Sequence, residues 1–236
     1  QLADNPYAGA WGSGGDLNQA RSLLSGAGIQ TAALAFSGDG SPVPAAGTDT
    51  ESYNGTSWTE GNALNTSRYG AAGIGLYTAA LAAGGANDAS TVSNMDNVES
   101  WDGTNWTEIA EINTGRAHMG GRAAGTQTAG LIFGGLNTYP GTNVLAVTEL
   151  WNGSAWTEVN DLNTGRYYAG GSGTQTSAMY YGGQSGDGST ETWDGTSWTE
   201  VNNLNEGRQG GAGVGTNTSS AQYTGGEDPG SPAIAN

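Results

Sequence analysis

Cysteine and lysine are absent from this chain of 236 residues, and histidine occurs once, as His118. Without cysteine the chain can form neither a disulfide nor a thiolate metal site. A single histidine with no cysteine beside it leaves no His-based zinc site. No apolar run approaches the roughly 18 residues of a membrane-spanning helix. The sequence therefore predicts no cofactor, no metal and no membrane span.

Basic charge is also scarce. Six arginines face 22 acidic residues, and the net charge is −16. Such a surface repels phosphate backbones, so we do not expect nucleic-acid binding. Nothing indicates a Ser-His-Asp site on a nucleophile elbow. Most acidic residues recur in every repeat described below, whereas a catalytic pair would break that symmetry. We therefore expect no enzymatic activity.

What the chain does contain is a repeat. The stretch "YNGTSWTEGNALNTSR" at 53–68 recurs at 101–116, 151–166 and 193–208, and a degraded copy lies at 7–21. The second aromatic residue of each copy advances in steps of 47, 48, 50 and 42 residues, from Trp11 through Trp58, Trp106 and Trp156 to Trp198. Such periods belong to propeller blades or helical arrays. The 43 glycines and the scarcity of strong helix formers favour strands.

One unit predicts four short strands, which we name a to d in chain order. In the second unit they are expected at 69–76, 78–85, 97–103 and 105–112. Asn-Gly or Asp-Gly separates strands c and d in four units, and this pair is the strongest short hairpin signal because both residues tolerate a positive φ.

Stacking such sheets around an axis buries both of their faces. We therefore predict an all-β, five-bladed β-propeller of four-stranded antiparallel blades in a single domain, 1–236. The chain ends on strands a and b of a unit, at 209–216 and 219–226, and begins with a c–d piece, "NPYAGAW". We expect the last blade to be closed by both termini. The predicted blades are 18–65, 66–113, 114–163, 164–205, and 206–236 together with 1–17.

These motifs resemble the kelch repeat: an arginine opens the inner strand, Gly-Gly ends the second, an aromatic lies in the third and Trp opens the fourth. The double glycine is present at Gly84, Gly134, Gly182 and Gly225, whereas the first blade has "SGDG". Kelch proteins usually have six or seven blades, so five is a departure. The sequence "DGTSWTEVNNLN" is similar to kelch-like repeats in virion and tail proteins of tailed bacteriophages.

Five arginines occupy one place in the repeat, three residues after an Asn. They are Arg21, Arg68, Arg116, Arg166 and Arg208. One hypothesis is a ring of guanidinium groups that binds an anion at the channel mouth. The interpretation we favour pairs each arginine with a glutamate of strand c (Glu51, Glu99, Glu149 or Glu191), with the Asn capping the link through its own backbone. For the repeated Trp and Tyr pairs we likewise favour packing between blades over sugar stacking.

The b–c connections vary most among the units, and variable loops on a rigid scaffold are where binding usually occurs. Neutral drift in tolerant loops is the alternative. The connections are 38–49, 86–96, 136–146, 184–189 and 227–233. The candidate ligand- or partner-binding residues on them are Asp39, Pro42, Asn87, Asp88, Asn137, Tyr139 and Asp187.

The function that this sequence favours is a non-enzymatic structural or adhesive module of a phage or similar particle, located on a virion or outside the cell. Its b–c face would bind another particle protein or a host-surface glycan. A free secreted lectin that uses the repeated aromatic residues is the alternative, and a glycan-processing enzyme is the third possibility.

Overall fold

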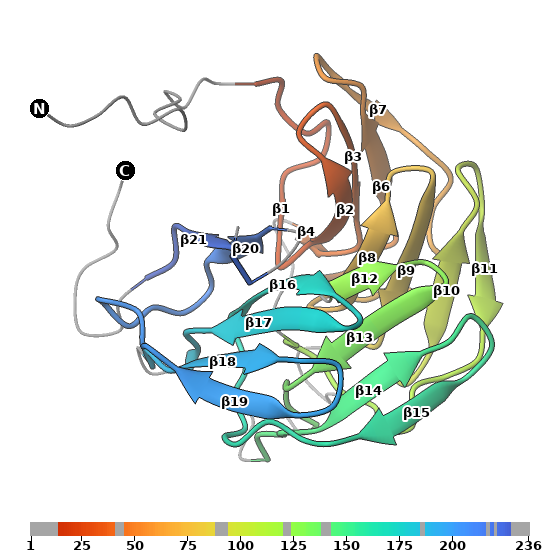
Figure 1. Cartoon of the computed structure of the whole chain (residues 1–236). Helices are drawn as coiled ribbons and strands as arrows, with labels where there is room; N and C mark the ends of the chain where they lie inside the picture. Colours follow the sequence, from red (N-terminus) through yellow and green to blue (C-terminus); the bar gives the residue numbers. More distant parts are fainter. Residues whose placement is uncertain are drawn as a thin grey trace, which may run out of the picture.

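The computed structural model describes residues 14–40, 45–87, 94–119, 124–137, 143–184, 187–215, 218–219 and 221–227. In these residues the chain forms four four-stranded antiparallel sheets. The sheets lie around a common axis, with strand a of each innermost and strand d outermost (Figure 1). The protein is therefore a β-propeller. In the described ranges, no helix is long and apolar enough to cross a membrane.

Each complete blade runs a-b-c-d from the axis outward. Blade one contains β2 (Ser25–Ile29), β3 (Ala32–Phe36), β6 (Thr50–Tyr53) and β7 (Trp58–Glu60). Blade two contains β8 (Ala72–Leu76), β9 (Ala79–Ala83), β10 (Val98–Trp101) and β11 (Trp106–Ile109). Blade three contains β12 (Ala124–Thr126), β13 (Ala129–Phe133), β14 (Thr148–Trp151) and β15 (Trp156–Val159). Blade four contains β16 (Gly170–Thr174), β17 (Ser177–Tyr181), β18 (Thr190–Trp193) and β19 (Trp198–Val201).

The fifth repeat is represented by two strands, β20 (Ala212–Val214) and β21 (Gln222–Thr224), and β20 lies beside β16 (Figure 1). The c–d piece that the sequence predicts for this blade, at 5–11, lies outside the described residues. A further small sheet joins β1 (Arg21–Ser22), β4 (Asp39–Gly40) and β5 (Ala45–Ala46). The described residues thus form four complete blades and the inner half of one more.

The c–d hairpins form where the Asx-Gly pairs occur. In blade two, the Asp102 carboxylate accepts hydrogen bonds from the backbone N–H groups of Thr104 and Asn105, both at 2.8 Å. These two bonds lower the pKa of Asp102 because they stabilise its charged form. Asn54, Asn152 and Asp194 bind the backbone of their own turns in the same way. The side chain before each glycine therefore specifies the turn.

Glycine is required where the inner strands of neighbouring blades approach each other. A Cβ atom added to Gly73 would lie 2.4 Å from the carbonyl oxygen of Gly26 in the preceding blade. The double glycine after strand b is also constrained. Gly84 and Gly85 have φ angles of 61° and 107°, and a Cβ at Gly84 would lie 2.6 Å from the Arg116 carbonyl oxygen of the next blade. In blade one, Ser37 and Gly38 adopt the same conformation, with φ angles of 61° and 110°.

The hydrophobic core lies between the blades. The tryptophan that opens strand d packs against the preceding blade: Trp106 meets Phe36, and Trp198 meets Phe133, each with ring centroids 4.9 Å apart. Six tryptophans of blades two to four are buried: Trp101, Trp106, Trp151, Trp156, Trp193 and Trp198. These side chains hold neighbouring sheets together and are inaccessible to a sugar.

Candidate functional site

Arginine–glutamate pairs join the d–a link to strand c in all four complete blades. The nearest oxygen of Glu51 lies 3.1 Å from Arg21, and that of Glu99 lies 2.7 Å from Arg68. Arg116 pairs with Glu149 and Arg166 with Glu191 in the same way. All eight side chains are at most 2% exposed. The pairing that the sequence suggests is thus present at four of the five positions.

The asparagine three residues before each arginine completes a cage around the glutamate. Asn65 donates to Glu99 through its backbone N–H, at 2.8 Å, and through its side-chain amide, at 2.9 Å. The same amide also donates to the carbonyl oxygen of Trp106, at 3.0 Å. The prediction that this Asn bonds its own backbone is therefore wrong, because the buried carboxylate needs donors and takes them from the link. Asn18, Asn113 and Asn163 repeat the arrangement. We call each set of Asn, Arg and Glu a clamp.

Burial sets the electrostatics of the clamps. It lowers the pKa of the Arg68 and Arg116 guanidinium groups, and the carboxylates of Glu99 and Glu149 oppose that shift. Because an arginine stays protonated in proteins, Arg68 and Arg116 keep their positive charge despite this burial. The guanidinium groups of Arg68, Arg116 and Arg166 are fully buried, which leaves little of them accessible to an external anion.

Two of the clamps also hold the bases of b–c loops. Arg68 donates to the carbonyl oxygens of Gly84, at 3.0 Å, and Asn97, at 2.9 Å, and these two residues flank the loop 86–96. Arg166 donates to the carbonyl oxygen of Ser189, at 2.7 Å, where the loop 184–189 ends. Buried charged groups therefore fix both ends of the loop 86–96 and the far end of the loop 184–189.

The described candidate binding residues on the b–c loops have different surroundings. Asp39 lies in β4 and is partly buried, whereas Asn87 is exposed. Asn137 accepts a hydrogen bond from Asn143 in its own loop, and Asp187 accepts one from the backbone N–H of Ser189 at 2.8 Å. Within the ranges that the structure describes, no hydrogen bond or ion pair joins these four residues to each other. Pro42, Asp88 and Tyr139 lie outside the described residues.

The sequence did not reveal a chain of backbone hydrogen bonds around the axis. It is formed by the residues two positions after each of the five repeated arginines, and all of them have a positive φ: Leu23, Gly70, His118, Tyr168 and Gly210. Each N–H donates to the carbonyl oxygen of the preceding member, over 2.8 to 3.2 Å. The bond from Leu23 to Gly210, which would close the ring, is not formed between these two described residues. No shared residue type marks the positions, so the sequence carried no signal for them.

His118 belongs to this backbone chain and is 4% exposed. Its ring packs between those of Tyr69 and Tyr168, with centroids 5.7 and 4.6 Å away. Burial lowers the pKa of His118 to about 4, so the imidazole is neutral at neutral pH. His118 is therefore a neutral residue packed inside the fold. Among the side chains placed by the structure, no three of His, Cys, Asp or Glu are grouped so that they could hold a metal ion.

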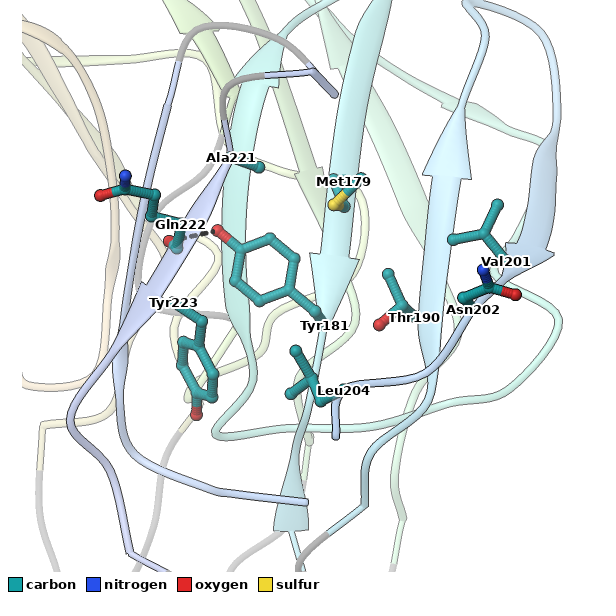
Figure 2. A pocket seen from close by; sticks show the side chains of 9 residues that line it. All are labelled: Met179, Tyr181, Thr190, Val201, Asn202, Leu204, Ala221, Gln222 and Tyr223. Atoms are coloured by element: carbon teal, nitrogen blue, oxygen red, sulfur yellow. Dashed lines mark hydrogen bonds between the residues drawn. The ribbon is translucent and has the colours of Figure 1, made fainter. Parts of the chain in front are cut away.

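A pocket of about 330 Å³ opens between blade four and β21. Figure 2 shows Tyr181, Thr190 and Leu204 around it, with the Tyr181 hydroxyl donating to the carbonyl oxygen of Gln222 at 3.1 Å. The rest of its lining is Met179, Val201, Asn202, Ala221, Gln222 and Tyr223. We call it the terminal pocket. It has an apolar lining and contains no acidic pair among these lining residues.

Comparisons with known proteins agree with the fold. No family model and no curated protein matches the chain. A solved structure that it resembles is that of YjhT, with 15% sequence identity and a TM-score of 0.75 over 92% of this chain and 80% of that chain. At this level of identity the likeness shows the β-propeller fold alone.

Proposed function

We propose that this chain is a non-enzymatic binding module of a phage or similar particle, with kelch-like repeats. It would present its b–c loops to another particle protein or to a host-surface glycan. The observation that carries the proposal is that these loops differ in length and composition while the clamps beneath them are the same in four repeats. Loops with fixed bases lose less conformational entropy when they bind a partner.

The engagement of the repeated residues weighs against the other uses of this scaffold. An anion-binding arginine ring would need accessible guanidinium groups, but Arg68, Arg116 and Arg166 are fully buried. A lectin that stacks sugars on the repeated aromatics would need accessible rings, but six tryptophans of blades two to four are buried. The b–c loops contain no clamp residue, and they are the parts of the repeat that vary in length and composition.

We also infer that the propeller closes as five blades, with β20 and β21 completed by the N-terminal part of the chain. Residues 14–18 support this closure. They contact blade one in the way that the link after strand d contacts the next blade in the other repeats. Asn18 holds Glu51, as Asn65 holds Glu99. A Cβ at Gly15 would lie 2.9 Å from the Thr56 carbonyl oxygen, in the c–d turn of blade one.

Loop replacement tests the proposed function. The loops 38–49 and 136–146 are each replaced by the short sequence of 184–189, and the purified variants are assayed for binding to intact particles of the source and to immobilised host-surface glycans. We expect both variants to unfold cooperatively, the 38–49 variant at a lower temperature because it lacks β4 and β5, and both to lose binding. Full binding by both folded variants would contradict the proposal.

The matched control changes the opposite face. Asn152→Asp converts the c–d turn of blade three to the Asp-Gly form already present at Asp102 and Asp194. We expect this variant to fold and bind like the original chain. Loss of binding in the control would move the binding surface to the a–b and c–d turns.

A further inference from the structure

We propose that the terminal pocket is the binding site for the indole side chain of Trp11, the tryptophan that opens strand d of the fifth repeat. The proposal rests on the five-blade closure inferred above and identifies the contact that would hold it. Trp11 itself lies outside the described residues. Support comes from the pocket and from the equivalent positions in the other repeats.

Three described interfaces show what such a tryptophan contacts. The Trp106 ring packs against Phe36 of strand b in the preceding blade and clusters with Leu64 of the following link. Its Nε1–H donates to Thr50 Oγ1 of strand c at 2.9 Å. Trp198 repeats these contacts with Phe133, Leu162 and Thr148, with its Nε1 3.0 Å from the hydroxyl oxygen. Trp156 packs with Val98 and Ile112 at the interface between them.

The terminal pocket offers the same three groups from blade four. Tyr181 ends strand b, as Phe36 and Phe133 do, and Thr190 opens strand c, as Thr50 and Thr148 do. Leu204 lies in the link at the place of Leu64 and Leu162. All three line the pocket and face it in Figure 2. An aromatic wall, an apolar floor and a hydroxyl acceptor fit an indole ring.

A side chain beside the pocket is also more exposed than its equivalents. Val201, the last residue of β19, is 40% exposed. Ile109 and Val159, at the same place in β11 and β15, pack against the buried core clusters. Blade four therefore offers a hydrophobic surface at the interface where the other blades receive a tryptophan.

Register selects Trp11 as the occupant. In every repeat the tryptophan of strand d precedes the clamp asparagine by seven residues, and Trp11 precedes Asn18 by the same interval. Asn18 already occupies its clamp, since its amide donates to Glu51 at 2.8 Å and to the Trp58 carbonyl oxygen at 3.2 Å. The interval from a clamp that is already in place therefore selects Trp11 as the proposed occupant of the pocket.

A double-mutant cycle in the full chain tests the contact. Trp11→Phe keeps a ring but removes the N–H donor, and Thr190→Val removes the acceptor. We expect each change to lower the ratio of folded to unfolded chain about fivefold, and the double variant to lose no more than either single variant. The reference cycle is Trp106→Phe with Thr50→Val, where the hydrogen bond is present in the structure. Additive effects at positions 11 and 190, with coupling in the reference cycle, would overturn the proposal.

Trp11→Ala provides a second readout, because it would leave an indole-sized space in the pocket. Free indole is expected to raise the melting temperature of this variant and not that of the original chain. If Trp11→Ala does not fold, the double-mutant cycle alone decides. Coupling that appears only in a dimer, with concentration-dependent stability, would assign the pocket to Trp11 of a second copy and overturn closure within one chain.

The outcomes separate this inference from the proposed function. Absence of coupling together with loop-dependent binding would overturn the pocket assignment alone. Coupling together with loops that can be replaced without loss of binding would overturn the proposed function alone.

Discussion

Arg166 and Arg208 occupy the same place in successive repeats, but their surroundings differ. The Arg166 side chain is fully buried against Glu191. That of Arg208 is 27% exposed and pairs with Glu206, which is itself 71% exposed, at 2.9 Å. Strand c supplies the glutamate of a clamp, and the c–d piece that we propose for the fifth repeat lies at the other end of the sequence. There Asn5 stands two residues before Tyr7, where the other repeats have glutamate before their aromatic residue.

The repeated arginine therefore has no single role. Inside a complete blade it compensates a buried carboxylate, whereas in the fifth repeat it takes part in a solvated ion pair. Equivalent positions can be tested against one another within one chain, with the same chemical change made in two environments.

The largest difference is expected between Arg116→Ala and Arg208→Ala. Removing Arg116 leaves Glu149 buried without its counter-charge, which costs about 3–5 kcal/mol of unfolding free energy. Removing Arg208 breaks a solvated pair and costs less than about 1 kcal/mol. Urea unfolding of the two variants measures both values. Glu149→Gln, the control, is expected to destabilise in the same direction as Arg116→Ala. Equal small losses at Arg116 and Arg208 would contradict a structural role for the clamp.

The stability of the protein is expected to depend on pH through His118, which belongs to the chain of backbone hydrogen bonds around the axis. Its folded pKa of about 4 lies below its ordinary value of 6.5. As the pH falls, the unfolded chain therefore binds the proton at a higher pH than the folded chain does. Its contribution to stability is full above pH 6.5, falls as the pH drops towards 4, and is constant below. The loss amounts to at most about 3 kcal/mol.

The control for this pH effect is His118→Asn, because Asn tolerates the positive φ of 52° at this position. Carboxylates titrate in the same pH range, so the difference between the two stability curves isolates the histidine. Parallel curves between pH 7 and pH 4 would show that His118 is protonated as readily in the folded chain as in the unfolded one.

A smaller contrast is expected between Asn163→Ala and Asn205→Ala. Asn163 donates to Glu191 through its side chain at 2.8 Å and to the Trp198 carbonyl oxygen at 3.2 Å. Its loss is expected to cost about 1–2 kcal/mol, since hydrogen bonds to a charged group are among the stronger ones. In the described part of the chain the Asn205 side chain forms no hydrogen bond, and its replacement is expected to change the unfolding free energy by less than about 0.5 kcal/mol. Thermal unfolding of both variants tests the contrast, and an equal loss would mean that Asn205 also occupies a clamp.

The repeat made much of the fold predictable. The Asx-Gly pairs form the c–d hairpins where they were expected, and the strand order of each complete blade follows the predicted order a to d. The ends of the strands were harder to predict. The inner strand expected at 69–76 begins at Ala72 as β8, because Tyr69 and Gly70 form backbone hydrogen bonds to Ala86 and Leu23. These bonds join distant parts of the chain and leave no local pattern.

The candidate site was predictable only in part. Arginine and glutamate recur together, and opposite charges at fixed places in a repeat suggested the pairing that is present in four blades. The cage formed by the asparagine could not be inferred, because Asn favours local turns as readily as long-range contacts. The terminal pocket could not be inferred either, since it depends on which inter-blade positions are filled.

The smallest expected effect concerns one hydrogen bond between blades. Trp198 donates its Nε1–H to Thr148, but at the preceding interface the threonine is replaced by Val98, and the buried Nε1 of Trp156 has no hydrogen-bond partner among the described residues. Val98→Thr has nearly the same shape and supplies an acceptor, so we expect it to stabilise the chain by about 1 kcal/mol. Thr148→Val makes the reverse change at the next interface and is expected to destabilise by a similar amount. Urea midpoints that move in opposite directions would show that the two interfaces differ by this bond. A loss of stability in both variants would mean that a hydroxyl at position 98 does not bond the Nε1–H of Trp156. The packing at this interface would then differ from that at the other interfaces.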